Sequence, residues 1–156
     1  MVGPFHVSQN SVLRIAKTLS FALEMATRKL AYSQGFDDAI LMNDRGYIAE
    51  ATSANIFWVK NNKLYTPSMR SGCLDGMTRR IVLDFAKKDK IQTVEKFFKI
   101  ETLYGADEVF ITSSLKLILP VIYIQKQNLH TGFKYRIGEM TTYLQNRLYD
   151  YIFKGD

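Results

Sequence analysis

Residues 37–68 alternate between short apolar runs and strong turn signals, and this pattern limits the possible folds more than any other feature. Each run is short enough for one strand, and together they cover residues 37–43, 47–51, 55–60 and 63–68. The sequences Asn-Asp-Arg-Gly and Asn-Asn, which separate members of each pair, are typical of hairpin turns. We therefore expect two successive β-hairpins.

Helical periodicity occurs in three other parts of the chain. Residues 19–34 have apolar side chains at helical spacing, and Gly35 follows as a C-cap. Residues 77–89 predict an amphipathic helix, and residues 131–153 predict a terminal helix. The apolar positions of the terminal helix would be Ile137, Met140, Tyr143 or Leu144, and Leu148.

Further strands are expected at residues 93–100, 108–114 and 118–125. Hairpins interspersed with a few helices indicate an α/β (α+β-like) domain with a mixed, largely antiparallel sheet. We expect residues 1–12 to be a linker or a cut end, because Gly3-Pro4 interrupts regular structure, and residues 13–156 to form one domain.

The composition argues against several classes of protein. The chain has 21 basic and 15 acidic residues, but the basic residues are scattered, so we expect no nucleic-acid binding. No apolar stretch is long enough for a membrane span, and the first residues lack the layout of a signal peptide. One cysteine, Cys73, fits a reducing compartment and hence the cytoplasm. Because the sequence contains only this cysteine and two histidines, a metal site is not expected.

Two charged residues are candidates for chemistry. Lys17 lies among apolar residues at the entry to a helix. It is either a solvated helix-start residue or, if partly desolvated, a nucleophile able to form a Schiff base. Glu50 precedes the small polar patch 51–55 and is either an exposed strand residue or a buried acid. A buried acid needs a partner such as a protonated ring nitrogen.

Two further segments offer hydrogen-bond donors to an anion. Gly76 is followed by Met77 and Thr78, whose backbone N–H groups and hydroxyl would lie at the start of a helix. The strand at 108–114 ends in Thr112, Ser113 and Ser114. Each segment alone could be an ordinary cap or turn. Together with Lys17 and Glu50 they provide the amine, the acid and the phosphate donors that pyridoxal 5′-phosphate requires.

In order and spacing, four segments resemble the C-terminal domain of the class IV (fold type IV) pyridoxal-phosphate aminotransferases. They are AKTLSFAL, GFDDAILMNDRGYIAEATSANIFWVKNNKLYTP, GCLDGMTRRIVL and ADEVFITSSLKLILPV, and they cover about residues 15–125. The resemblance implies a pseudo-barrel with flanking helices. It also implies roles for individual residues: Lys17 as the Schiff-base lysine, Glu50 at the pyridine nitrogen, Leu74 against the ring, Met77, Thr78 and Ser114 at the phosphate, and Asn55 in the turn. We expect Ser113, which precedes Ser114, to bind the cofactor as well.

The resemblance implies amino-group transfer between a branched-chain or similar amino acid and a 2-oxo acid, in a homodimer. Two alternatives stay open: an aminodeoxychorismate lyase, which eliminates pyruvate, and a non-catalytic domain. Ser20, Ala51 and the segment SSLKLILPV depart from the usual aminotransferase pattern, and SSLKLILPV and SANIFW resemble the lyase branch more. Family members also have an N-terminal domain of roughly a hundred residues, and nothing in this sequence matches it. We therefore expect reduced activity from this chain alone.

Overall fold

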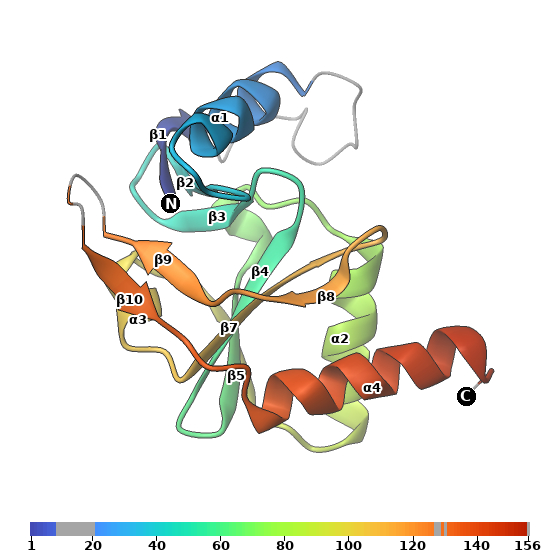
Figure 1. The fold of residues 1–156 in the computed structure, drawn as a ribbon. Coiled ribbons are helices and arrows are strands. Elements are labelled where there is room, and N and C mark those ends of the chain that lie inside the picture. Colours follow the sequence, from blue (N-terminus) through green and yellow to red (C-terminus); the bar gives the residue numbers. More distant parts are fainter. Residues whose placement is uncertain (9–20, 127–128, 130, 156) are drawn as a thin grey trace.

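The computed structural model describes residues 1–8, 21–126, 129 and 131–155. Figure 1 shows the elements in chain order. They are β1 (Val2–Val7), α1 (Ala22–Ser33), β2 (Ile40–Asn43), β3 (Ile48–Ala51), β4 (Asn55–Lys60), β5 (Lys63–Pro67), the 3-10 helix η2 (Met69–Ser71), α2 (Met77–Lys88), β6 (Thr93–Lys96), α3 (Glu101–Tyr104), β7 (Glu108–Ser113), β8 (Leu117–Pro120), β9 (Tyr123–Gln125), β10 (Gly132–Lys134) and α4 (Glu139–Phe153).

The strands form three mixed or antiparallel sheets, which confirms the predicted fold class. The largest sheet has the order β6-β5-β4-β7-β8, and a three-stranded sheet has the order β1-β2-β3. Strands β9 and β10 form a separate pair. Among the strand pairs of the described residues, β1–β2 and β5–β6 are parallel and the others are antiparallel. The two larger sheets meet at the bridge between Ala51 and Ala54, where β3 passes into β4.

Both predicted hairpins are present. Strands β2 and β3 pair across the Asn-Asp-Arg-Gly turn, and β4 and β5 pair across Asn61-Asn62. Asn61 and Asn62 have φ values of 49° and 58°. A two-residue turn with both central residues in the left-handed region matches the twist of the flanking strands, and asparagine tolerates that region well.

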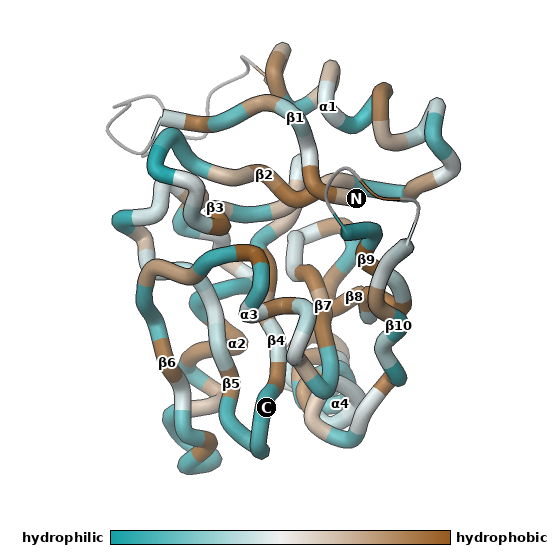
Figure 2. The backbone as a smooth tube through the Cα atoms, turned by 90° about the vertical axis from the view of Figure 1, so that its left-hand side faces the viewer, coloured by the Kyte–Doolittle hydropathy of each residue, from teal (hydrophilic) through white to brown (hydrophobic). Residues whose placement is uncertain are grey.

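The central strands β4 and β7 of the five-stranded sheet are buried on both faces, which explains the nearly continuous apolar run of β4. Phe57 and Val59 face α2 and α4, whereas Ile56 and Trp58 belong to a second cluster on the opposite face. Figure 1 shows α2 and α4 beside this sheet and α1 over the three-stranded sheet. In Figure 2 the brown, apolar colour covers parts of β2 and β7. Alternation between two apolar faces therefore leaves no polar stripe on β4.

The helix predicted at residues 19–34 corresponds to α1, whose end lies where the sequence predicts it. Gly35 has a φ of 81°, and its N–H donates to the carbonyl of Tyr32. The N–H of Phe36 donates to the carbonyl of Ala31, which completes a Schellman motif. Across the described ranges, no helix is long and apolar enough to cross a membrane.

The prediction of a linker is wrong for residues 2–7, which form β1. Val2 and Val7 are buried, and β1 pairs in parallel with β2. Pro4 is tolerated because β1 is an edge strand, where a missing N–H costs little. The register shifts between Val2 and His6, around Gly3-Pro4. A Cβ on Gly3 would lie 2.6 Å from Thr27 of α1, so glycine permits this close packing.

The predicted terminal helix is wrong in its first part. Residues 132–134 form β10, and α4 begins only at Glu139. Two tertiary contacts hold the preceding residues outside a helix. The hydroxyl of buried Tyr135 donates to the carbonyl of Leu103, and Glu108 contacts the start of α4. Ile137 is exposed, whereas Leu144 and Leu148 are buried as the helical pattern predicts.

Candidate cofactor site

Glu50 lies near the end of β3 and is buried, with 8% of its surface exposed. Its Oε2 accepts a hydrogen bond from the backbone N–H of Leu74 at 3.0 Å. The side-chain amide of Asn55 lies 3.4 Å from the same oxygen. Two hydrogen-bond donors thus converge on this carboxylate. From its position in the strand alone, Glu50 would be expected at the surface. This arrangement lowers the cost of burying the charge.

Asn55 connects Glu50 to the loop before α2. Its Nδ2 also donates to the carbonyl of Leu74 at 2.7 Å. The polar patch between Glu50 and Asn55 is a tight turn, closed by the N–H of Ala51 donating to the carbonyl of Ala54 at 2.8 Å. The turn therefore directs both side chains toward the residue 74 segment, and the half-buried Leu74 is fixed through its own backbone N–H and carbonyl.

Helix α2 begins directly against Asn55. Gly76 is its N-cap residue, and a Cβ there would lie 2.2 Å from Oδ1 of Asn55. Within the described ranges, no side chain caps the first turn by hydrogen bonding. Met77 is 72% exposed and Thr78 is buried, at 6%. The start of α2, with N–H groups available to an anion, is consequently positioned by the same residue that contacts Glu50.

The end of β7 lies next to Asn55. Asn55 and Thr112 are directly opposed in the antiparallel β4–β7 pair, so their side chains share one face of the sheet. The hydroxyl of Thr112 is buried and has no hydrogen-bond partner among the described residues. Ser113 is half-buried and accepts a hydrogen bond from the N–H of Lys116, whereas Ser114 is exposed. The structure thus brings three of the four predicted segments together.

The fourth segment contains Lys17, which lies outside the described residues. The predicted site residues that are described are Glu50, Leu74, Met77, Thr78, Ser113 and Ser114. As for metals, the described part of the chain contains no group of three or more His, Cys, Asp or Glu residues able to hold one.

Asp38 is a residue of this region that sequence reasoning missed. It lies just before β2, and its carboxylate contacts Thr52, Ser53 and Lys116. Burial would raise the pKa of Asp38, but hydrogen bonds from Lys116, Thr52 and Ala39 and the charge of Lys116 hold that pKa below its usual value. The only signal in the sequence was an acid beside an apolar run, which is equally typical of an ordinary strand end.

Comparison with known proteins identifies the family. The model of the family described as amino-transferase class IV matches residues 4–124. A branched-chain-amino-acid aminotransferase of Pseudomonas aeruginosa is 30% identical over 91% of this chain and 45% of its own length. An aminodeoxychorismate lyase of Bacillus subtilis is 34% identical over 69% of this chain and 36% of its own length.

A solved structure has the same fold. The branched-chain aminotransferase from Thermoproteus uzoniensis, solved with norvaline, superposes with a TM-score of 0.88 at 28% identity, over 96% of this chain and 49% of that one. The chain spans about half the length, or less, of the relatives that it matches. The matched residues cover most of the described fold and every segment of the candidate site, so the chain belongs to the amino-transferase class IV family.

Proposed function

We propose that this chain forms the pyridoxal-phosphate-binding part of an aminotransferase. The reaction would move an amino group between a branched-chain or similar amino acid and a 2-oxo acid. The observation that carries the proposal is the arrangement around Asn55, which contacts Glu50 and Leu74 and closely approaches Gly76 at the start of α2. One residue thereby contacts the buried acid and closely approaches the helix start that we propose binds the phosphate.

The residues of the site fit this cofactor in their chemistry. Glu50 is a buried acceptor, suited to a protonated ring nitrogen. The start of α2 with Thr78 and the serines at 113 and 114 provide donors suited to a phosphate dianion. The hydroxyl of Thr112, buried without a partner among the described residues, is a further unused donor beside Asn55. Half-buried Leu74 offers an apolar contact for a ring face.

When bound, pyridoxal phosphate supplies an aldehyde that reacts with amines and a ring that accepts electrons from the substrate carbon. The chain supplies the other functions. Lys17 would act as the amine that holds the cofactor and then moves a proton to and from the substrate α-carbon. Glu50 would hold a proton on the ring nitrogen, which maintains the electron-accepting state of the ring.

Aminodeoxychorismate lyase is the second candidate, favoured by the 34% identity to the Bacillus subtilis protein of that name. Both reactions begin with proton removal from the α-carbon, so Lys17 and Glu50 would serve either one. The segments SSLKLILPV (residues 113–121) and SANIFW (residues 53–58) support this alternative. The residues that direct the subsequent step belong to the substrate pocket and decide between the two reactions.

The test is a product assay on a protein that carries this chain, supplied with pyridoxal phosphate. Leucine, isoleucine and valine are offered with 2-oxoglutarate, and aminodeoxychorismate is offered separately. Glutamate formed from the branched-chain donors supports the transferase. Pyruvate and 4-aminobenzoate from aminodeoxychorismate support the lyase instead. If a protein with bound cofactor forms none of these products, both proposals are overturned and the alternative of a non-catalytic domain remains.

The proposal includes a homodimer in the cytoplasm. The support for the compartment is that the sequence has a single cysteine, Cys73, which is buried. The support for the dimer is the family resemblance alone. Sedimentation of the purified protein at several concentrations measures the oligomeric state directly.

A further inference from the structure

An ion pair connects two turns at the candidate site. Nζ of Lys116, in the turn between β7 and β8, lies 2.8 Å from Oδ2 of Asp38. The side chains are largely buried, with 24% of Lys116 and 14% of Asp38 exposed. Nζ of Lys116 also lies 3.2 Å from the hydroxyl of Ser53, in the turn between β3 and β4. Because the pair is shielded from water, it is stronger than a surface ion pair.

The other oxygen of Asp38 holds the β3–β4 turn. Oδ1 accepts hydrogen bonds from the backbone N–H of Thr52 at 3.1 Å and from the hydroxyl of the same residue. It also accepts one from the N–H of Ala39 at 2.8 Å. Asp38 therefore binds the turn that follows Glu50 through Oδ1 and the β7–β8 turn through Oδ2. The carboxylate fixes the separation of these two turns.

Two of the proposed phosphate contacts lie at the end of β7 and in the β7–β8 turn that follows. Ser113 and Ser114 directly precede Leu115-Lys116, and the N–H of Lys116 donates to the hydroxyl of Ser113 at 3.0 Å. Lys116 is thus held at its backbone by Ser113 and at its ammonium by Asp38. Loss of the ion pair would release one side of the turn that must present donors to the phosphate.

We propose that Lys116 and Asp38 are positioning residues that hold the β7–β8 turn for binding the cofactor phosphate. The inference rests on the proposed function, since it assigns a role toward the same cofactor. The charge of Lys116 is neutralised by Asp38, so the contribution is geometric and does not come from an added positive charge at the phosphate. A lysine that contacted the phosphate directly would instead bind more tightly once Asp38 were removed.

The experiment compares pyridoxal phosphate with pyridoxal, which lacks the phosphate, by titration of the whole protein followed by absorbance. We expect Lys116→Met and Asp38→Asn each to weaken pyridoxal phosphate binding about tenfold while changing pyridoxal binding less than about twofold. Lys116→Arg should restore most of the loss because it can pair with Asp38. Lys60→Met is the matched control: it removes the Lys60–Asp107 ion pair at the other end of β4.

A second measurement is independent of the cofactor. Amide hydrogen exchange at residues 113–117 should become faster in both variants and stay unchanged in the Lys60 control. Should Lys116→Met fail to fold, Lys116→Gln replaces it, because glutamine loses the charge while keeping a hydrogen-bond donor.

Three results would overturn the inference. They are unchanged pyridoxal phosphate binding, an equal loss for both ligands, and tighter binding in Asp38→Asn. If the unmodified protein binds neither ligand, the proposed function itself fails, which is a result distinct from all three.

Discussion

The backbone N–H of Leu74 donates to the carboxylate of Glu50 across 3.0 Å, so a residue of β3 is fixed to the loop that leads into α2. Glutamine at position 50 keeps an oxygen for this hydrogen bond but loses the negative charge. We expect Glu50→Gln to fold normally and to slow turnover on the order of a hundredfold, through lost stabilisation of the ring-nitrogen proton. Steady-state kinetics on cofactor-loaded protein measure the effect.

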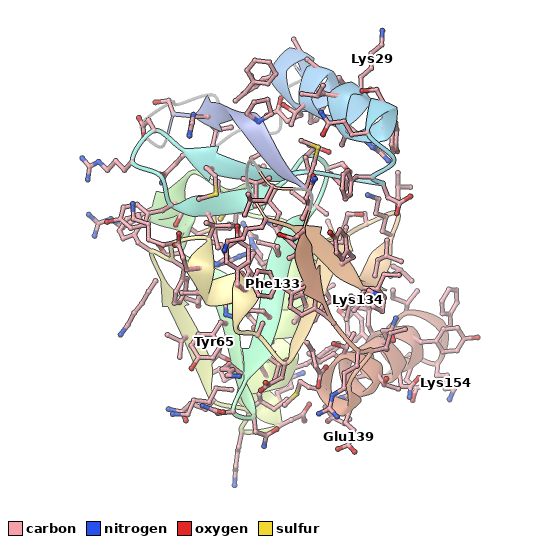
Figure 3. The ribbon with its side chains drawn as sticks, turned by 60° about the vertical axis from the view of Figure 1, so that its left-hand side comes forward. Lys29, Tyr65, Phe133, Lys134, Glu139 and Lys154 are labelled. Atoms are coloured by element: carbon pink, nitrogen blue, oxygen red, sulfur yellow. The ribbon has the colours of Figure 1, made fainter. Side chains whose placement is uncertain are left out.

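The control for this variant is Glu139→Gln, at the exposed start of α4, where Figure 3 shows the side chain away from the rest of the domain. Undiminished turnover of Glu50→Gln with a full load of cofactor would remove Glu50 from the site.

Gly76→Ala should damage the site through Asn55. The new Cβ would lie 2.2 Å from Oδ1 of Asn55, which would have to move away from Glu50 and Leu74. We expect a loss of about 1–3 kcal/mol in the free energy of unfolding, together with weaker cofactor binding. Urea denaturation and cofactor titration measure the two effects.

Gly105→Ala is the matched control for that substitution. Gly105 has a φ of −96°, and a Cβ there meets no atom within 4 Å. We expect its free energy of unfolding to stay within about 0.5 kcal/mol of the parent. Equal effects at both glycines would mean that the contact with Asn55 is unimportant.

Lys17→Ala should abolish the visible absorption band of the bound cofactor, because the proposed covalent attachment requires the amine of Lys17. Lys29→Ala serves as the control; Lys29 is exposed on α1, and Figure 3 shows it pointing outward. Spectra of both variants after removal of unbound cofactor give the answer. A band that persists in Lys17→Ala would assign the attachment to another amine.

Glu108 holds the start of α4 from another element. Its Oε2 accepts hydrogen bonds from the N–H and the hydroxyl of Thr141 at 2.8 Å and 2.6 Å, and Glu108 is 6% exposed. A negative charge at a helix N-terminus is stabilising, so Glu108→Gln should lower the free energy of unfolding by about 1–2 kcal/mol. Glu139 lies in the first turn of α4 and is exposed, so Glu139→Gln should lower the free energy of unfolding far less. Similar losses in chemical denaturation for the two variants would contradict this role.

The pH dependence of stability should depend on Asp38. Because its pKa in the folded protein lies below the usual value, the ionised carboxylate stabilises the fold at neutral pH. This contribution is complete above the usual aspartate pKa of about 4 and is lost as the pH falls through the lowered value. Asp38→Asn should therefore have a lower free energy of unfolding than the parent protein. This deficit should be constant between about pH 5 and 8 and should shrink in more acidic solution.

Urea unfolding of both proteins over a pH series measures that deficit. A deficit that grew as the pH fell would have the wrong sign and would contradict the assigned pKa direction.

Local chemistry was sufficient to predict much of the fold. Asn61-Asn62 predicted a hairpin because few residues tolerate two positive φ values in succession, and Gly35 predicted the end of α1 for the same reason. Predictions failed where a distant contact decided the outcome. Residues 2–7 form a strand because β2 is available to pair with them, and residues 132–134 pair with β9. Neither partner could be read from the local pattern.

The sequence alone determined most of the elements and the types of chemical group, because turn residues, helical spacing and side-chain chemistry are properties of neighbouring residues. It left Glu50 either exposed or buried and did not identify Asp38 at all. Only the tertiary structure decided these points, since Glu50 is held by Leu74 from 24 residues away and Asp38 by Lys116 from 78 residues away. Hydrogen bonds between such distant groups form only after the sheets have packed, so no local pattern encodes them.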